Sequence, residues 1–199
     1  LVLMFVLDTN VVSELRKAKT GKADKNVTLW AASASLGGLF LSAITILELE
    51  IGVCLVERRD PIQGAVLRSW MDGSVLPAFA GRVLAVDTAV AKRCARLHVP
   101  NPCADRDALI AATALVHGMT VVTRNVADFK LTGVRTLNPW ANMRALLAFE
   151  APDGLDVQVA DRENLLASGA VAAREPTQRI ATDGGSESVQ RRQPAKFQN

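Results

Sequence analysis

The sequence predicts one α/β domain built on a mainly parallel sheet, and three observations lead to this fold class. Short apolar runs alternate with longer segments of helical character up to about residue 140. The first run, Leu3 to Leu7, is continuously apolar, as expected for a strand that is buried on both faces. Asp8 follows this run directly, and parallel α/β sheets bind ligands beyond the carboxyl ends of their strands. With 199 residues, of which 49% are hydrophobic, the chain is long enough for one domain with a substantial core.

In the first half of the chain we expect two strands and four helices. In order, they are a strand, two helices, a strand and two helices over residues 3–7, 11–17, 27–35, 39–43, 46–59 and 62–71. Asp8, with Thr9 and Asn10, supplies capping side chains for the first helix, and glycines 37–38 end the second one. Thr45 can cap the third helix, and Pro61 ends it or opens the next.

In the second half we expect three strands and two helices. The strands are expected over residues 83–86, 121–123 and 134–137. Asp87 and Thr88 cap a helix that continues to about His98. Another helix begins at Asp105 or Asp107 and runs to His117, followed by Gly118 at the position where helices favour glycine. After Trp140 the composition changes, and we expect 141–199 to be a largely disordered C-terminal extension of a domain spanning 1–140.

Composition excludes several classes of protein. The longest apolar runs are too short to cross a bilayer, so no membrane association is expected. The 3 cysteines are odd in number and lack metal-ligand spacing, which favours a reduced, cytoplasmic setting. With only 2 histidines as well, a zinc site is not expected. The net charge of +3 is too small an excess to predict a nucleic-acid partner by itself.

Acidic residues stand in or directly after apolar segments at four places that are far apart in the sequence. They are Asp8, Glu48, Asp107 and Asp128. Carboxylates are seldom placed among apolar residues without compensation, and a cluster of four would resist complete ionisation. A cation such as Mg²⁺ prefers carboxylate oxygens and water, and it removes this repulsion. If the fold brings the four together, the pattern predicts a metal site and therefore phosphoryl chemistry.

Four sequence blocks, taken together, resemble those of PIN-domain ribonucleases, in particular the VapC/FitB-type toxin branch. The blocks are Val6 to Leu15, Leu41 to Leu49, Asp107 to Ala114 and Val122 to Phe129, and the resemblance extends to Asn138-Pro139-Trp140. They occur in the expected order and spacing, so that the resemblance covers about residues 3–140. It implies a three-layer α/β/α sandwich, a homodimer, and RNA cleavage with Mg²⁺ or Mn²⁺. It also implies a cognate antitoxin that occupies the acidic groove.

The resemblance assigns roles to individual residues. Asp8, Glu48 and Asp107 match the acidic core of the family, with Asp8 and Asp107 as metal ligands and Glu48 beside the attacking water. Thr9, Asn10 and Thr123 hold these carboxylates next to the substrate, and Arg124 meets a phosphate or an antitoxin acid. Many members have an Asp where this chain has Asn125, so either Asp128 replaces it or Asn125 binds through its amide oxygen.

Alternatives remain open at several residues. Asp107 can be read as a helix N-cap with Asp105 serving the site, although Asp107 is preferred because the run Ala-Leu-Ile-Ala-Ala-Thr follows it in register. Glu50 lies about 200° around the helix from Glu48 and is expected to face solvent. Two other functions compete with the nuclease. One is a catalytically weakened protein that binds RNA or a partner, and the other is a phosphatase with Asp8 as nucleophile, which Asn10 disfavours because that chemistry usually has an acid there.

Overall fold

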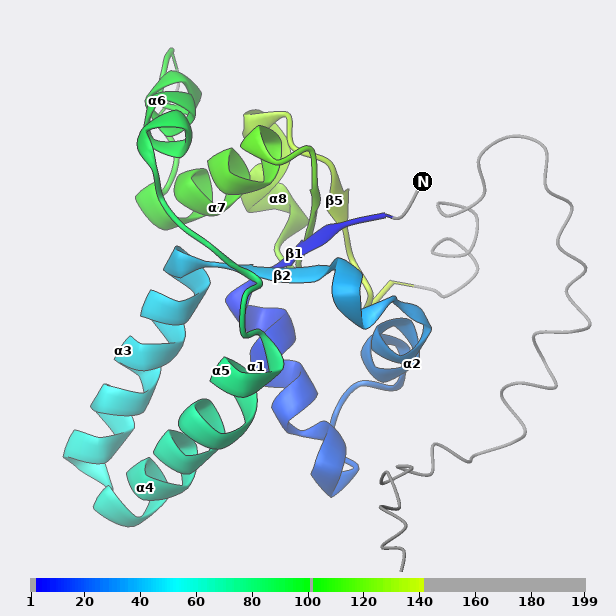
Figure 1. The fold of residues 1–199 in the computed structure, drawn as a ribbon, viewed down its shortest axis with the longest axis vertical. Helices are drawn as coiled ribbons and strands as arrows, with labels where there is room; N and C mark the ends of the chain where they lie inside the picture. Colours follow the sequence, from blue (N-terminus) through cyan, green and yellow to red (C-terminus); the bar gives the residue numbers. More distant parts are fainter. Residues whose placement is uncertain (1–2, 101, 142–199) are drawn as a thin grey trace, which may run out of the picture. The chain divides into compact units, whose positions relative to one another are not determined.

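The computed structural model describes residues 3–100 and 102–141, so all but the first residue of the predicted extension 141–199 lies outside the described part. A sheet of 5 strands, all parallel, forms its centre in the order β3-β2-β1-β4-β5. The strands are β1 (Phe5–Leu7), β2 (Leu39–Ser42), β3 (Val83–Leu84), β4 (Thr120–Val122) and β5 (Thr136–Leu137). Figure 1 shows β1 and β2 crossing the domain between two groups of helices.

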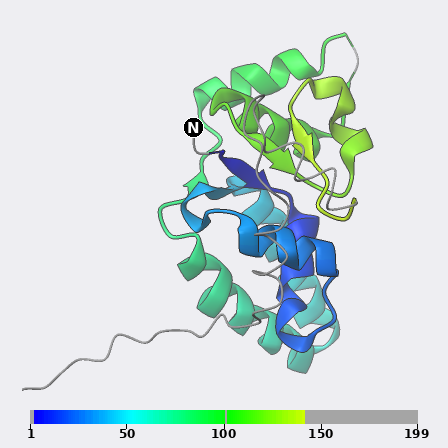
Figure 2. The same cartoon turned by 90° about the vertical axis from the view of Figure 1, so that its right-hand side faces the viewer.

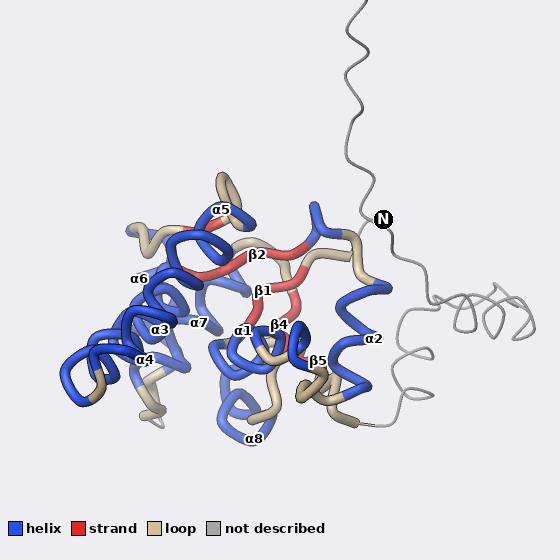
Figure 3. The backbone as a smooth tube through the Cα atoms, turned by 90° about the horizontal axis from the view of Figure 1, so that it is seen from below, coloured by secondary structure: helices blue, strands red, loops and turns tan. Residues whose placement is uncertain are grey.

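Successive residues of each central strand point to opposite faces of the sheet, and each face has its own core. Leu7, Leu41 and Val122 pack on one face with residues of α1 (Thr9–Arg16), α2 (Lys25–Ser33) and α3 (Ala43–Arg59). Val6 and Val121 pack on the other face with α7 (Asp105–Val116) and α8 (Val126–Phe129). Figures 2 and 3 show helices on both sides of the strands. The three-layer α/β/α sandwich with a parallel sheet is therefore confirmed.

Helices α3 and α4 (Pro61–Trp70) form a tightly packed antiparallel hairpin. Asp60 begins α4, because its carboxylate accepts hydrogen bonds from the backbone N–H groups of Ile62 and Gln63 at 3.1 and 3.0 Å. Gly64 permits the close approach of the two helices: a Cβ atom there would lie 2.4 Å from the Cα of Glu57. No side chain larger than hydrogen fits at this position without moving a helix.

Several boundaries differ from the predicted ones. Helix α3 begins at Ala43 and is capped by Ser42, whereas the Thr45 hydroxyl donates to the carbonyl of Leu7 at 3.1 Å and ties α3 to β1. Helix α7 begins at Asp105 after an N-cap at Ala104, so Asp107 lies inside the first turn and is not the cap. The cap prediction was therefore wrong for Thr45, and the alternative reading of Asp107 as a cap is excluded.

The remaining helical segments are α6 and several shorter stretches. They comprise α6 (Thr88–Leu97), α5 (Leu76–Ala78), a π-helical stretch (Met71–Val75) and 3-10 turns at Ala18–Thr20, Leu36–Gly38 and Lys130–Thr132. The sequence pattern did not predict α5, α8 or the π-helical stretch, because segments of this length have too few residues to show a period. Among the described helices, none is both long enough and apolar enough to cross a membrane.

Candidate active site

The parallel topology brings the acidic residues to one edge of the sheet. Asp8 follows β1 directly, and Glu48 lies in the second turn of α3, which continues from β2. Asp107 lies in the first turn of α7, the helix that leads into β4. Because α7 returns across the sheet before β4 starts, its N-terminus lies near the carboxyl ends of the strands. Asp128 is in α8, just after β4.

Asp8 is the most deeply buried of these acids, with 6% of its surface exposed. Its Oδ1 accepts from the backbone N–H of Thr9 at 2.7 Å. Its Oδ2 accepts from Asn10 Nδ2 and from the Thr123 hydroxyl, both at 2.6 Å. Burial raises the pKa of Asp8 above its usual range, and the charge of Glu48 raises it further, while these three donors lower it without cancelling the rise. Three hydrogen bonds therefore fix the position of this carboxylate, although its surroundings disfavour its ionised form.

A hydrogen-bond network extends from Asp8 to its neighbours. The Thr9 hydroxyl donates to Glu48 Oε2, which links α1 to α3. Asn10 donates through Nδ2 to the Thr123 hydroxyl at 3.1 Å, and its Oδ1 accepts from the backbone N–H of Arg124 at 3.3 Å. The hydroxyl of Thr123 also accepts from the backbone N–H of Asn125 at 2.9 Å. Thr9, Asn10 and Thr123 thus each donate a side-chain hydrogen bond to Asp8 or Glu48.

Asp107 faces the other acids and is half-buried. Its pKa is raised, first by burial and then by the charges of Asp8, Asp128 and Glu48. Within the described residues, no hydrogen-bond donor compensates its carboxylate. The four predicted acids therefore share one region of space, and Asp107 experiences the negative charge of the other three.

Arg124, Asn125 and Asp128 are exposed at the end of β4 and in α8. The Arg124 guanidinium lies over the ring of Trp140, 5.3 Å from its centroid, while its backbone is bound to Asn10. Trp140 also packs against the core that contains Leu7. Of the two candidates for the fourth acidic position, Asp128 contributes charge at Asp107, whereas Asn125 carries none.

Arg106 was not recognised from the sequence as a residue of this region. Its Nη1 lies 3.6 Å from Glu48 Oε1, and 53% of its side chain is exposed. Its position directly before Asp107, on the turn of α7 that faces the acids, is the signal that could have identified it.

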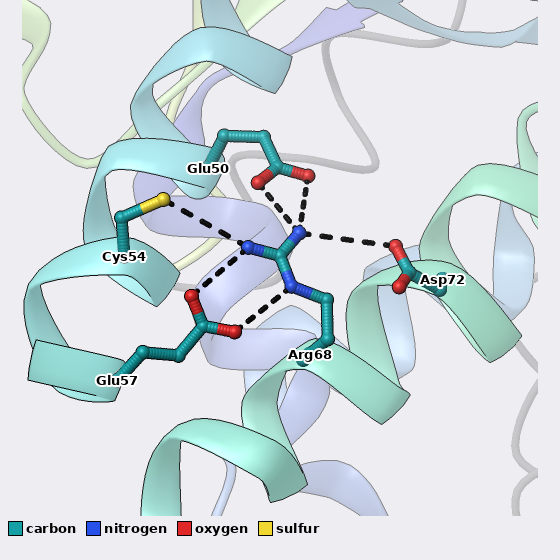
Figure 4. A network of polar contacts seen from close by, with 5 residues as sticks. All are labelled: Glu50, Cys54, Glu57, Arg68 and Asp72. Atoms are coloured by element: carbon teal, nitrogen blue, oxygen red, sulfur yellow. Dashed lines mark hydrogen bonds and ion pairs between the residues drawn. The ribbon is translucent and has the colours of Figure 1, made fainter. Parts of the chain in front are cut away.

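Glu50 belongs to a different acidic cluster, which Figure 4 shows between α3 and α4. Arg68 Nη1 donates to both oxygens of Glu50 at 2.9 and 2.7 Å, while Nε and Nη2 donate to Glu57 at 3.0 and 3.2 Å. Asp72 lies 3.9 Å from the same guanidinium. The prediction that Glu50 faces solvent was wrong, because its side chain turns toward α4 and pairs with Arg68.

The donor set at the sheet edge fits a hard divalent cation. In the described ranges, no group of three or more His, Cys, Asp or Glu side chains is arranged so that it alone could hold a metal ion. Mg²⁺, however, usually binds through one or two carboxylates and keeps several waters. Asp107 has an uncompensated carboxylate in a field of three further acids, which is the environment such a cation stabilises. Asp8 and Asp107 are therefore suitable ligands.

The fold and the site together define a class of protein, namely a parallel α/β sandwich with an acidic site at the carboxyl edge of its sheet. Residues 5–133 match the PIN domain family, and the chain belongs to this family. The resemblance predicted from the four sequence blocks is confirmed.

Curated relatives and solved structures agree with this assignment. The chain is 38% identical over 142 residues to the VapC ribonuclease Y4jK of Sinorhizobium fredii, a match that spans 69% of this chain and 98% of that protein. It is 38% identical over 143 residues to the toxin FitB of Neisseria gonorrhoeae, covering 69% and 99% of the two chains. A crystal structure of FitAcB from Neisseria gonorrhoeae aligns with a TM-score of 0.64 at 37% identity, covering 70% of this chain and 100% of that one. A structure of FitAB bound to IR36 DNA gives a TM-score of 0.63 at 38% identity, covering 70% and 97%.

Proposed function

We propose that this protein is a metal-dependent endoribonuclease that hydrolyses RNA phosphodiester bonds and acts as the toxin of a toxin–antitoxin pair. The observation that carries the proposal is the environment of Asp107, whose pKa is raised by burial and by Asp8, Asp128 and Glu48. Four acids from separate chain segments converge without enough donors to neutralise them. The relatives support the reaction class, since Y4jK is named a ribonuclease and FitB a toxin.

In this proposal each acidic residue has a distinct task. Asp8 and Asp107 would hold Mg²⁺ or Mn²⁺, and Thr9, Asn10 and Thr123 keep Asp8 in position through the hydrogen bonds described above. When bound, a divalent cation lowers the pKa of water and offsets the charge of the phosphate. Glu48, oriented by the Thr9 hydroxyl, positions a water for in-line attack and accepts its proton.

The substrate side of the site is formed by residues after β4. Arg124 is supported by the face of Trp140 and by the bond from its backbone to Asn10, so its guanidinium is available to a phosphate. Asn125 lies beside it, and Asp128 supplies the fourth acidic charge. That contribution of Asp128 at Asp107 favours an active enzyme over a binding-only protein, because Asn125 does not leave the site short of charge.

The proposed partners are the RNA substrate, a cognate antitoxin and a second copy of the chain. The relative FitB is named a toxin, and a solved structure shows FitAB bound to a DNA fragment. An antitoxin that silences this protein has to cover the acidic edge of the sheet. Its chemistry is therefore expected to include a cation that pairs with the carboxylates in place of a metal ion.

The test is a cleavage assay with the full chain, purified without antitoxin. Structured RNAs are incubated with Mg²⁺, Mn²⁺ or EDTA, using wild type, Asp8→Ala and the matched acidic control Asp72→Ala. Cleavage should require metal, disappear in Asp8→Ala and persist in Asp72→Ala, because Asp72 belongs to the Arg68 cluster. Full activity of Asp8→Ala, or equal activity in EDTA, would contradict the proposed site.

A further inference from the structure

Arg106 is a cation that lies within the acidic site, and the proposed reaction gives it no role. It lies between Asp105 and Asp107 in the first turn of α7. The closest approach of its guanidinium to Glu48 is 3.6 Å, from Nη1 to Oε1, and more than half of the Arg106 side chain is exposed. The other oxygen of Glu48 is bound by Thr9. Thr9 therefore binds one oxygen of Glu48, and Arg106 lies nearest to the other.

Arg68 shows how this chain binds an arginine that has a structural role. It places four hydrogen bonds on Glu50 and Glu57, at 2.7 to 3.2 Å. The closest contact between Arg106 and Glu48, at 3.6 Å, is longer than a hydrogen bond and accessible to water. Exposed pairs of this kind contribute little to stability. Arg106 is therefore held near Glu48 and remains free to exchange this carboxylate for another anion.

The site also requires positive charge for its substrate. An RNA phosphodiester approaching Asp8, Glu48, Asp107 and Asp128 is repelled by all of them, and one divalent cation offsets only part of this charge. A guanidinium presents paired N–H groups that match two phosphate oxygens. Arg106 carries such a group next to Glu48, the residue that is proposed to position the attacking water.

We propose that Arg106 is a substrate-binding residue that leaves Glu48 for the non-bridging oxygens of the RNA phosphate. Binding of RNA then also releases Glu48 Oε1, which becomes available to the water. This exchange breaks one ion pair and forms another, and no covalent bond changes. The inference rests on the proposed nuclease function and adds to Arg124 a second residue that binds substrate phosphate in the same site.

The first test measures RNA binding in full-length chains made inactive by Asp8→Asn. A 5′-fluorescein-labelled stem–loop RNA is titrated by fluorescence anisotropy in Mg²⁺ at several NaCl concentrations. Arg106→Gln should weaken binding and reduce the slope of log Kd against log salt by about 1, because one phosphate contact is lost. Arg106→Lys should retain the slope with part of the affinity. Arg96→Gln, an exposed arginine of α6 for which the described residues offer no side-chain partner, is the matched control and should change neither quantity.

The second test uses the same substitutions at Arg106 and Arg96 in the active chain. Arg106→Gln should raise KM more than it lowers kcat and leave the pH profile of kcat in place. An unchanged salt slope together with a changed kcat and pH profile would overturn the inference, since Arg106 would then act only through Glu48. Wild-type KM and salt slope in Arg106→Gln would also overturn it, with the nuclease function intact. Binding with the expected loss of slope but no cleavage would retain Arg106 as a phosphate contact and refute the nuclease. A chain that neither binds nor cleaves RNA would refute both.

Discussion

Helix α3 carries acidic residues into two clusters that are compensated in opposite ways. Glu50 and Glu57 face α4, where Arg68 binds both carboxylates and Asp72 lies nearby. Hydrogen bonds from Arg68 lower the pKa of Glu57, and the two acids in turn raise the pKa of Arg68. Glu48, on the other face, joins Asp8 and Asp107, whose pKa values are raised.

The difference separates a structural cluster from a functional one. In the hairpin, each charge has a partner within the fold, so ionisation favours the folded state. At the sheet edge, burial and mutual repulsion oppose ionisation, the donors to Asp8 relieve this only in part, and an added cation would relieve the remainder. Such a cost is typical of binding and catalytic sites, and this agrees with the role proposed for the acidic site.

The largest expected effect is that of Asp107→Asn on cleavage. Loss of a metal-binding carboxylate should reduce the cleavage rate by at least about 100-fold. The melting temperature should stay the same or rise slightly, because the neutral amide removes a charge that its surroundings disfavour. Cleavage assays and calorimetry on the same preparation measure both quantities. A marked fall in melting temperature would show that Asp107 is mainly structural.

Gly64→Ala should damage the hairpin while leaving the acidic site unchanged. A Cβ there lies 2.4 Å from the Cα of Glu57, a backbone atom that cannot rotate away. Overpacking costs about 1–3 kcal/mol, and so close a contact with a backbone atom places the cost above the roughly 1 kcal/mol that alanine gains over glycine in a helix. Urea unfolding should therefore show a net loss of stability. The matched control is Gly52→Ala in α3, where no such neighbour lies within 4 Å and the same substitution should stabilise the protein.

Arg68→Gln should lower the melting temperature at neutral pH without reducing cleavage, and the loss should depend on pH. Because the folded-state pKa of Glu57 is lowered, its ionised form stabilises the fold above its unfolded value of about 4.3. This contribution disappears as the pH falls through the lower folded-state pKa, so wild type and variant should converge in acid. Melting curves from neutral to acidic pH measure the convergence. A difference that grows in acid would contradict this assignment.

At the acidic site, stability should depend on pH in the opposite direction. The folded-state pKa of Asp107 is raised, so its ionised form destabilises the fold above that pKa. Any stability gained by Asp107→Asn should therefore be greatest at neutral pH. It should vanish as the pH falls below the unfolded value of about 3.9. Melting curves of Arg68→Gln and Asp107→Asn, measured over the same pH range, thus compare the two clusters directly.

The smallest expected effect is that of truncation after residue 145. Within residues 3–100 and 102–141, neither cluster uses a residue beyond Asp128, and Trp140 is the last one that contacts a residue of the site. We expect the shortened chain to keep its melting temperature and its cleavage rate, as proposed for a domain that spans 1–140. A large loss of stability would show that the extension packs on the domain.

Local pattern was sufficient for much of this fold. The continuous apolar run before Asp8 predicted β1, and its residues are indeed buried on both faces. Strong periodicity and capping residues predicted α1 through α4, α6 and α7, with boundaries that differ by a few residues. Those differences arise where a tertiary contact determines the role of a side chain: Thr45 bonds to Leu7 in β1, and so it does not cap α3.

Sequence alone singled out the four acids that we propose carry the chemistry, since Asp8, Glu48, Asp107 and Asp128 were recognisable from their blocks. Only the tertiary structure decided how their charges interact. It placed Asp107 near the charges of the other three acids. It also brought Arg106 within 3.6 Å of Glu48 and paired Glu50 with Arg68. The physical reason is range: periodicity and caps record interactions within a few residues, whereas electrostatic coupling depends on distances in space. Those distances follow from strand order and helix packing across the whole chain.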